Sequence, residues 1–347
     1  MSPRSKKKRT LVWSFLFIAV GAVMTVIMSW EWLGDNRLPN VKENIVLNVR
    51  PANTVEDVLA KLEPAVKRPG SLRRAFREHQ VRDYMKPGHY EIKKGSTSVY
   101  VTRMLNNGWQ TEVNLTISGS LRRKGDIAAK ISSQMLVDSL SMLAALNDAA
   151  LLKSYGFTPQ TVWAMIIPDT YKMYWNASPK DILDRQKKAY DAFWTKENKA
   201  KAKALGLTQL EVSILASIVK GESNYQPDFA KLAGVYINRL RVGMRLQSCP
   251  TVAYVFDYRK NRILEKDLKV KSPYNTYIND GLPPGPICVP DKVYLEAVLN
   301  PDTRDGYLYF AAAPSFDGTH RFAKSFKEHS RNGREYQKAF EARYGKR

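Results

Sequence analysis

The sequence contains very little cysteine and histidine. Among its 347 residues there are two cysteines, Cys249 and Cys288, and four histidines. Two cysteines cannot build a disulfide framework, a four-thiolate zinc site or an iron–sulfur cluster held by this chain alone. His320 and His329 have no second set of ligands at a zinc spacing. The sequence therefore predicts no metal site and no cofactor.

Acidic residues are also scarce relative to basic ones. Lysine and arginine total 55 against 33 aspartates and glutamates, which gives a net charge of +22. A basic protein can bind nucleic acid, but no helix-turn-helix, zinc-finger or RNP pattern is present. The charge suits anionic lipid head groups or carboxylate-bearing polymers better. We therefore predict a membrane partner and no nucleic-acid partner.

Charged residues are absent from one long N-terminal run. Residues 10–30 form 21 uncharged positions, and at about 1.5 Å per residue they cover the roughly 30 Å hydrocarbon layer. Basic residues precede the run and acidic ones follow it, so the positive-inside rule leaves residues 1–9 in the cytoplasm. A cleaved signal peptide is the alternative, but no small-x-small site follows Ser29. The sequence predicts a single-pass anchor in the cytoplasmic (inner) membrane, with the body outside in the periplasm.

The exported body leaves two alternatives for the cysteines. Both residues lie in loops bounded by proline, next to Pro250 and Pro290. In an oxidising compartment they can form a disulfide, and otherwise they are two buried, unpaired thiols. The sequence does not set the distance that a disulfide requires, so both alternatives stay open.

The sequence after the anchor contains no internal repeats and predicts an α+β protein of several folded units. Residues 43–117 have the pattern of a small α+β domain, and residues 118–204 that of a helical middle region broken near Pro168. The expected elements of the small domain are strand 45–49, helix 54–62, helix 71–79, strand 87–92, a helix capped by Ser96 that ends before Gly108, and strand 111–117.

Residues 205–347 form the third region, a mixed α/β domain. Thr208 and Glu211 make a capping box that begins a helix. Asp228 is expected to cap a second helix over 229–240, which Gly243 ends. A loop rich in proline and glycine over 274–285, a helix over 291–299 and a strand over 307–311 follow.

Glu222 is the candidate for chemistry. On the first of these helices it shares the apolar stripe of Leu215 and Ile218, seven and four residues earlier. Burial and the negative end of the helix dipole both raise the pKa of such a carboxyl, and a neutral carboxyl can act as a general acid. The alternative is a helix-end glutamate that points to solvent or pairs with Arg239.

Several ordered blocks around Glu222 resemble the YceG/MltG family of endolytic murein transglycosylases. These blocks are residues 216–223 (ASIVKGES), 235–240 (VYINRL), 243–247 (GMRLQ), 250–252 (PTV), 274–277 (YNTY) and 281–287 (GLPPGPI). Upstream, Pro168–Tyr171 is similar to a proline-aspartate-threonine-tyrosine segment of the family. Gly88–Tyr90 and Ser96 resemble its LysM-like region, which would make residues 43–117 a LysM-like domain.

The resemblance implies that Glu222 is the catalytic residue. The family pattern has an acid and a lysine at the positions of Lys220 and Gly221, and a threonine at that of Ser223. Glu222 is therefore the only carboxylate of the block. The implied reaction cleaves the β-1,4 bond between N-acetylmuramic acid and N-acetylglucosamine within glycan strands and leaves a 1,6-anhydromuramyl end. One residue that acts first as acid and then as base suffices, whereas hydrolysis normally needs two carboxylates.

The same blocks supply candidate substrate-binding residues with amide, hydroxyl, guanidinium and aromatic groups. They are Asn238, Arg245, Gln247, Thr251, Tyr274, Asn275 and Tyr277. Each can instead have a structural role, in bonding a neighbouring loop or in the core. The partners implied are peptidoglycan glycan strands and peptidoglycan synthases, with a role in limiting the length of nascent glycan. The alternative is an inactive, membrane-anchored glycan-binding or division scaffold.

Overall fold

The computed structural model describes residues 3–345, with side chains described from residue 12 onward. Two compact units are present: the first holds the chain up to Val113 together with Lys172–Asn176, and the second holds Asn114–Tyr171 and Ala177 onward. Helices and strands occur in both units, as the expected α+β class requires. Of the expected tail 1–9, residues 1 and 2 lie outside the described residues. The expected boundary at 204 and 205 falls inside the second unit.

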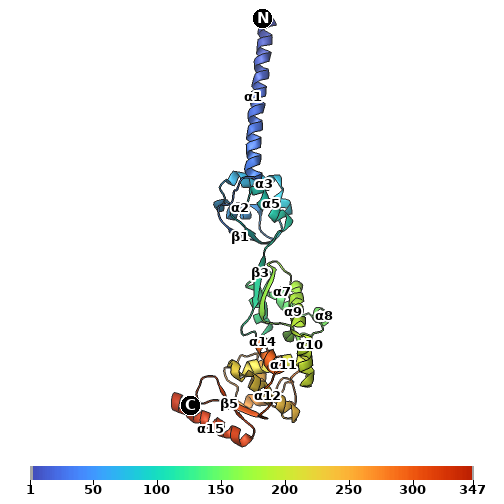
Figure 1. Ribbon diagram of the computed structural model, residues 1–347, viewed down its shortest axis with the longest axis vertical. Coiled ribbons are helices and arrows are strands. Elements are labelled where there is room, and N and C mark those ends of the chain that lie inside the picture. The colour runs from blue at the N-terminus through green and yellow to red at the C-terminus, as the bar shows by residue number, and fades with distance from the viewer. Residues whose placement is uncertain (1–2, 346–347) are drawn as a thin grey trace. The chain divides into compact units, whose positions relative to one another are not determined.

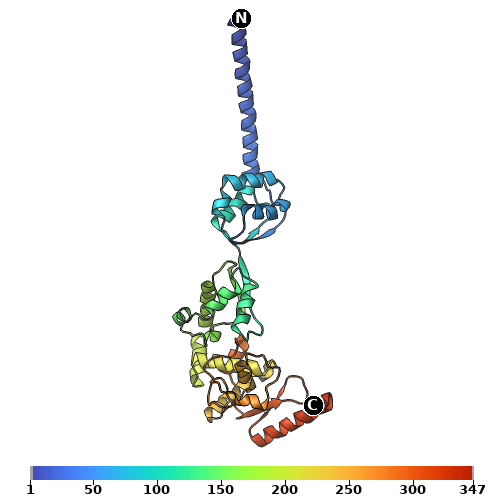
Figure 2. The same cartoon turned by 180° about the vertical axis from the view of Figure 1, so that it is seen from behind.

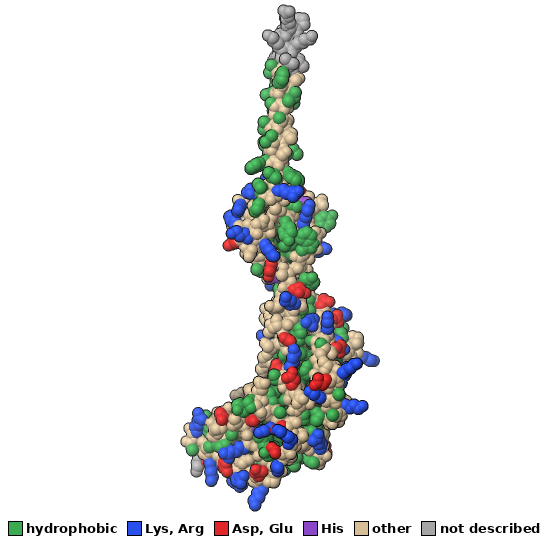
Figure 3. Space-filling view, viewed as in Figure 1, with side chains coloured by type: hydrophobic (Ala, Val, Ile, Leu, Met, Phe, Trp, Pro, Cys, Tyr) green, Lys and Arg blue, Asp and Glu red, His purple; other side chains and the backbone are tan. Residues whose placement is uncertain are grey.

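Helix α1 (Pro3–Asn36) contains the predicted membrane anchor. Residues Val12–Asn36 are long and apolar enough to cross a membrane, and no part of their most apolar window is buried in the protein. Figure 3 shows apolar side chains along the part of this helix whose side chains are described. Helices α10 (Lys196–Ala204) and α11 (Gln209–Glu222) pass the same composition test together, but they are bent by 77°. The middle of α11 is buried in the second unit, so α1 is the candidate span.

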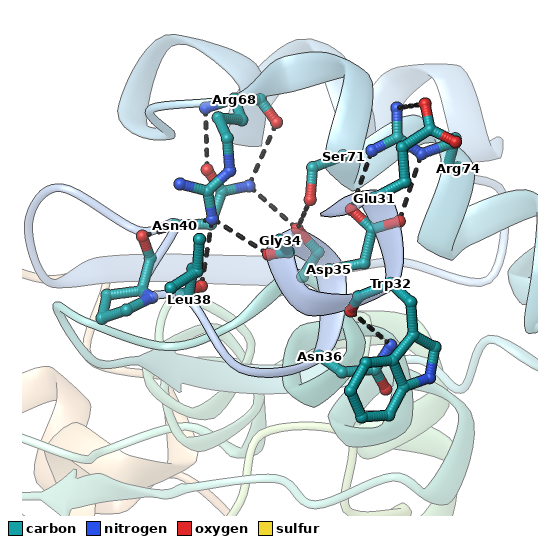
Figure 4. A network of polar contacts seen from close by, with 12 residues as sticks. Glu31, Trp32, Gly34, Asp35, Asn36, Leu38, Asn40, Arg68, Ser71 and Arg74 are labelled. Carbon is teal, nitrogen blue, oxygen red and sulfur yellow. Dashed lines mark hydrogen bonds and ion pairs between the residues drawn. The ribbon is translucent and has the colours of Figure 1, made fainter. Parts of the chain in front are cut away.

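The C-terminal end of α1 is fixed to the first unit by polar contacts (Figure 4). The Asp35 carboxylate is 3% exposed and accepts two hydrogen bonds from Arg74, at 3.2 and 3.0 Å. The Arg68 guanidinium donates to the carbonyls of Gly34 and Leu38, at 3.0 and 3.1 Å. A cation at these carbonyls satisfies acceptors that have no partner within the helix. The anchor helix and the first unit are therefore continuous.

The first unit packs helices on one face of a two-stranded antiparallel sheet. Strands β1 (Ile45–Val49) and β2 (Gly88–Ile92) place Leu47 opposite Tyr90, and both side chains are fully buried. The helices are α2 (Val55–Leu62), α3 (Pro69–Glu78), α4 (Val81–Tyr84) and α5 (Ser98–Asn107). The predicted elements from strand 45–49 to the helix before Gly108 occur in the predicted order, and α4 is an addition that was not predicted. The last strand predicted for this domain, 111–117, does not join its sheet. The likeness of this region to a LysM domain stays a prediction.

One predicted helix cap in this unit is wrong. The N-cap of α5 is Thr97, whose Oγ1 accepts from the Tyr100 amide at 3.2 Å. Ser96 instead donates from Oγ to the Lys93 carbonyl at 2.7 Å. The two hydroxyl residues are adjacent, and the tight turn before the helix uses the first of them. Gly108 ends α5 in the left-handed conformation, as expected.

The break near Pro168 is a strand, which the sequence analysis did not predict. Residues Asp169–Tyr174 form β4, and β4 pairs with β3 (Glu112–Ile117) in a two-stranded sheet. Tyr171 and Met173 are buried while their neighbours are exposed, which is the alternation of a strand. The remaining elements of the middle region are helices: α6 (Lys124–Ser132), α7 (Ser139–Ala145), α8 (Ala149–Ser154) and α9 (Pro179–Phe193), followed by α10.

Helix α11 is the centre of the second unit. It packs against α12 (Phe229–Arg241), α13 (Cys249–Val255) and α14 (Lys292–Leu299). The predicted capping box is confirmed, because Thr208 and Glu211 exchange side-chain and backbone hydrogen bonds. Asp228 occupies the N-cap position of α12, as expected, but its side chain makes no capping hydrogen bond to the helix. Its carboxylate accepts from the backbone amide of His320 at 2.8 Å.

The C-terminal part adds a hairpin and a long helix. Strand β5 (Tyr309–Ala312) starts two residues later than predicted and pairs antiparallel with β6 (His320–Ala323). Helix α15 (Phe326–Tyr344) lies beside both strands, as Figures 1 and 2 show from opposite sides. The sequence analysis predicted neither β6 nor α15. The hairpin matters for the site because it holds His320 and the residues just before it near Glu222.

Candidate active site

Glu222 is the last residue of α11. The helix is wholly buried from Val212 to Val219, and Leu215 and Ile218 on the same stripe are fully buried. Glu222 continues that stripe to the point where the helix reaches a cavity, and its side chain is half-buried. The predicted placement of this carboxyl on the inward face is therefore confirmed.

Two hydroxyl groups fix the Glu222 carboxyl. Tyr236 on α12 donates from Oη to Oε1 at 2.7 Å, and Ser248, just before α13, donates from Oγ to the same oxygen at 2.6 Å. Both donors are fully buried or nearly so. Since both bonds go to Oε1, the second oxygen, Oε2, is the one left for a proton or for a ligand.

Burial raises the pKa of Glu222 above its usual value. The hydrogen bonds from Ser248 and Tyr236 favour the carboxylate and oppose this shift, as do the nearby charges of His320 and Arg239, but burial is the largest effect. The neutral form carries its proton on Oε2, because Oε1 accepts two O–H groups. A carboxyl whose neutral form is favoured in this way is a candidate general acid.

The alternative pairing of Glu222 with Arg239 is not what the structure has. The Arg239 guanidinium donates to the backbone carbonyls of Leu308 and Leu246, each at 2.6 Å. Among the ion pairs of the described residues, none joins Arg239 to Glu222. Arg239 holds the segment before β5 and the loop before α13, and its charge acts on Glu222 only through space.

Glu222 borders two cavities of the second unit. The first has a volume of about 700 Å³, and its lining includes Arg122, Lys220, Cys249 and Tyr258. The second has a volume of about 480 Å³ and is lined largely by the β5–β6 hairpin and by residues 223–225. A carboxyl between two cavities can act on the middle of a chain that occupies both.

The seven predicted substrate-binding residues lie around the site but line neither cavity. Thr251 is fully buried, and its Oγ1 donates to the Ser248 carbonyl at 2.7 Å. Asn275 is fully buried, and its amide donates to the carbonyls of Leu268 and Val270, at 2.9 and 2.8 Å. Both residues therefore have the structural role that the sequence analysis gave as the alternative. They hold the loops that position Ser248.

The other predicted residues differ in exposure. Asn238 donates to the Tyr307 carbonyl at 3.1 Å, and exposed Arg245 forms an ion pair with Asp280 at 2.8 Å. Gln247 is exposed and has a left-handed backbone, with φ of 49°. Tyr274 packs on the Tyr254 ring, and its hydroxyl is buried without a hydrogen-bond partner. These contacts give Asn238 and Tyr274 structural roles.

Tyr277 and Cys249 meet beside the site. Their Oη and Sγ atoms are 3.0 Å apart, and burial raises the pKa of the tyrosine hydroxyl, with a contribution from the nearby charge of Glu222. Both cysteines are free thiols: Cys249 is exposed at the first cavity and Cys288 is buried. The structure therefore has no Cys249–Cys288 disulfide. The alternative of two buried thiols holds for Cys288 alone.

Each of the three residues that depart from the family block makes a specific contact in the structure. Lys220 forms an ion pair with Asp291 at 2.8 Å and donates to the Val289 carbonyl at 2.9 Å. A Cβ atom at Gly221 would lie 2.5 Å from the Pro250 side chain, so glycine is required for this close packing. Ser223 accepts from the Tyr225 amide at 3.0 Å.

The sequence analysis missed the two hydroxyl donors to Glu222. Tyr236 appeared there only within the block 235–240, and Ser248 lies outside the blocks, between 243–247 and 250–252. No short-range spacing connects them to Glu222, since they lie 14 and 26 residues further along the chain. Within the described residues, no cluster of three or more metal-ligating side chains is present.

Fold and site together define a mixed helix-and-strand protein with an acid held between two cavities. The YceG-like family model matches residues 47–335, and the chain belongs to this family. It is 30% identical over 267 residues to the endolytic murein transglycosylase of Bacillus subtilis strain 168, and the match covers 72% of each protein. It is 24% identical over 341 residues to that of Streptococcus pneumoniae strain D39, and the match covers 88% of this chain and 61% of the pneumococcal protein.

A solved structure agrees with this assignment. The crystal structure of a YceG-like protein from Listeria monocytogenes has a TM-score of 0.54 to this chain and 26% sequence identity. The likeness covers 84% of this chain and 99% of the Listeria chain. It therefore extends over almost the whole of the solved protein.

Proposed function

We propose that this chain is an endolytic lytic transglycosylase of peptidoglycan. It cleaves the β-1,4 bond between N-acetylmuramic acid and N-acetylglucosamine within glycan strands and leaves a 1,6-anhydromuramyl end. The observation that carries the proposal is the half-buried Glu222, with a raised pKa and an oriented carboxyl, between two cavities. The names of the relatives from Bacillus and Streptococcus support the substrate class.

Glu222 performs both proton transfers. Its neutral carboxyl donates the Oε2 proton to the glycosidic oxygen as the bond to the muramyl C1 breaks. The carboxylate so formed stabilises the oxocarbenium-like state and then accepts the proton of the muramyl C6 hydroxyl, whose oxygen closes the ring on C1. The proton returns to Glu222, and no water is consumed.

The other carboxylates at the two cavities are poorly suited to activate water. Asp291 is held in its ion pair with Lys220. Hydrogen bonds from Thr319 and Ser315 lower the pKa of Asp317 to about 2, which makes it a weak base at neutral pH. Hydrolysis normally needs a second carboxylate that acts as base or nucleophile. The state of these two groups therefore supports a lyase over a hydrolase.

The substitution Glu222→Gln tests the proposal. Removal of a general acid typically costs two to four orders of magnitude in rate, so we expect fragments with anhydro ends to fall about a thousandfold or more. The measurement is mass spectrometry of peptidoglycan digested by the full chain in detergent. Glu296→Gln, an exposed carboxylate on α14, is the matched control and should leave the rate unchanged.

Three outcomes separate the candidate functions. Fragments that carry one added water at the muramyl end indicate a hydrolase and contradict the lyase. Full activity in the Glu222→Gln variant excludes that residue as the acid. If the wild-type chain releases no fragments at any pH, the alternative of an inactive, membrane-anchored glycan-binding or division scaffold is favoured.

The wider setting follows from the anchor. The proposal places residues 1–9 in the cytoplasm, residues 10–30 across the cytoplasmic membrane and the body outside the cytoplasm. Residues 205–347 are then the catalytic domain, which follows the middle region 118–204. Residues 43–117 would be a LysM-like domain that holds glycan. Cleavage close to the membrane would limit the length of glycan released by peptidoglycan synthases. Glycan length distributions from cells with and without the protein test this role, and unchanged lengths would count against it.

A further inference from the structure

The first cavity beside Glu222 has a strong positive lining. Four basic side chains face it, and apart from Glu222 the only acidic residue of the lining is Asp291. The basic residues are Arg122, Lys220, Lys260 and Arg262. The second cavity has no lysine or arginine in its described lining. The charge therefore differs between the two sides of the carboxyl.

Protein carboxylates neutralise the two lysines of the first cavity. Lys220 pairs with Asp291 at 2.8 Å, and its side chain is 14% exposed. Lys260 pairs with the nearly buried Asp267. Neither lysine is free to attract a ligand at full strength, because a cation already paired with a carboxylate gains less from a second one. The excess charge of the cavity therefore resides on the arginines.

Arg122 and Arg262 have no acidic partner among the described residues. The Arg122 guanidinium lies over the Tyr258 ring, 5.1 Å from its centre, and the Tyr258 hydroxyl donates to the Ile287 carbonyl at 2.6 Å. The ring is thus fixed, and it holds one face of the guanidinium while the N–H edge stays available. Arg262 is exposed on the loop that follows α13. The two arginines come from distant parts of the chain.

The proposed substrate carries the matching charge. Each muramyl residue bears, through its lactyl group, a peptide stem with carboxylates, whereas N-acetylglucosamine is uncharged. Arginine binds carboxylate through two parallel, charge-assisted hydrogen bonds. We propose that Arg122 and Arg262 bind the carboxylates of the peptide stem next to the scissile bond, so that this site prefers peptide-bearing glycan over bare glycan. This inference rests on the proposed transglycosylase function.

Such binding also sets the direction of the strand. A stem held in the positive cavity places its muramyl residue on that side of Glu222. The neighbouring part of the strand then lies toward the hairpin cavity, whose described lining contains Asp317 and no lysine or arginine. A strand in the reverse direction would place N-acetylglucosamine, which carries no stem, next to the bond on that side, and its nearest stem would lie one sugar further from Glu222. The charge difference thus selects one of two orientations.

The test compares two substrates and two double variants of the full chain in detergent. The substrates are glycan strands with peptide stems and the same strands after an amidase has removed the stems and the lactyl carboxylates exposed by that cleavage have been converted to amides, so that the bare strands carry no charge. The variants are Arg122→Gln with Arg262→Gln, and, as a charge-matched control, Arg241→Gln with Arg331→Gln, two exposed arginines that line neither cavity. Thermal unfolding checks that each variant is folded.

The measured quantity is the ratio of kcat/KM for peptide-bearing strands to that for bare strands. Loss of hydrogen bonds between charged groups should lower this ratio about tenfold or more in the cavity variant, and the control should keep the wild-type ratio. A wild-type ratio near one, or an equal fall for both substrates, overturns the inference while the transglycosylase function stands.

A binding measurement separates this inference from the chemistry. In the Glu222→Gln background, the dissociation constants of both strand types are measured with and without the two arginine substitutions. We expect the arginine substitutions to weaken binding of peptide-bearing strands selectively. Equal affinities for the two strand types would overturn the inference even if the protein proves to have no lyase activity.

Discussion

The Glu222 carboxyl is subject to opposing effects on its pKa. Burial favours the neutral acid, and the hydroxyls of Ser248 and Tyr236 favour the carboxylate. Both hydroxyls also hold Oε1 in place, so that Oε2 keeps a defined position. The proposed mechanism needs the neutral acid first and the carboxylate second, because the same group must release a proton and then take one back. The pair of donors keeps the carboxylate state accessible.

Removal of one donor should therefore shift the pH dependence upward. In Ser248→Ala the carboxylate loses a hydrogen bond that lowers the pKa of Glu222, so this pKa rises further. The active form is the protonated acid, and activity falls as pH rises through this pKa. We expect the alkaline limb of kcat/KM to move to higher pH. Ser132→Ala on α6 is the control, and a shift of the limb to lower pH would contradict this account.

The raised pKa also has a consequence for stability. The unfolded carboxyl has a pKa near 4.5 and the folded one a higher value, so between them the folded state binds the extra proton. Stability then falls with rising pH across this window, by about 1.4 kcal/mol per unit. Glu222→Gln removes that dependence. We expect the variant to unfold at a higher temperature than wild type at pH 7, with a smaller difference at pH 4.5.

Thermal unfolding of the full chain in detergent at several pH values checks this expectation. The difference between variant and wild type should grow from acid to neutral pH. A difference that is independent of pH would mean that the Glu222 carboxyl has the same pKa in the folded and unfolded chain. The general-acid role would then lose its physical basis, whatever the variant does to activity.

At the scale of the elements, the end of α11 and the start of α13 are in close contact. A methyl group at Gly221 would lie 2.5 Å from the Cβ of Pro250, and Glu222 and Ser248 lie on either side of this contact. Gly221→Ala should therefore separate the two helix ends. We expect a loss of about 1–3 kcal/mol of stability, as in overpacked cores, together with a fall in kcat as the Ser248 bond lengthens.

A second glycine gives the matched control for this substitution. Gly125 lies in α6, and a Cβ atom there meets nothing within 4 Å. Gly125→Ala should stabilise the protein by about 0.4–1 kcal/mol, because it restricts the unfolded chain without strain in the folded one. Chemical denaturation and kcat measurements compare both variants. Equal effects of the two substitutions on stability and kcat would show that the close contact with Pro250 determines neither quantity.

The elements also show what the sequence can predict. The Thr208–Glu211 capping box and the spacing of Leu215, Ile218 and Glu222 are local patterns, so the start of α11 and its inward face were predicted correctly. Strand β4 was missed because its stability depends on pairing with β3, more than fifty residues earlier. The local sequence pattern around Pro168 carries no information about a pairing partner so far away in the chain.

The surroundings of the site were harder to predict for the same reason. Asn275 and Thr251 belong to blocks that resemble the family, yet both are fully buried and bond to neighbouring loops. A polar side chain that satisfies buried backbone groups looks the same in a sequence as one that binds sugar. Arg122 reaches the cavity from the segment after β3, and no motif around it indicates this position.

At the scale of the whole molecule, the anchor and the first unit share one helix. Asp35 and Arg74 join the end of α1 to α3 through a nearly buried ion pair. The chain then passes through β3 into the second unit and returns briefly through β4. The side of the membrane on which α1 places the body decides whether the proposed wall substrate is accessible at all.

The native cysteines allow this topology to be tested without added reporters. Cys249 is exposed and Cys288 is buried, so a membrane-impermeant maleimide should modify one thiol per chain. Although Cys249 is exposed, its Sγ atom lies against the Tyr277 hydroxyl, and partial desolvation raises the pKa of the thiol. Labelling therefore needs a pH of about 8 or above to form enough thiolate. In intact spheroplasts we expect Cys249 to be labelled at the rate seen after permeabilisation, and the Cys249→Ser variant to stay unlabelled. Labelling that requires permeabilisation would place the body, and Glu222 with it, on the cytoplasmic side, where there is no glycan strand to cut.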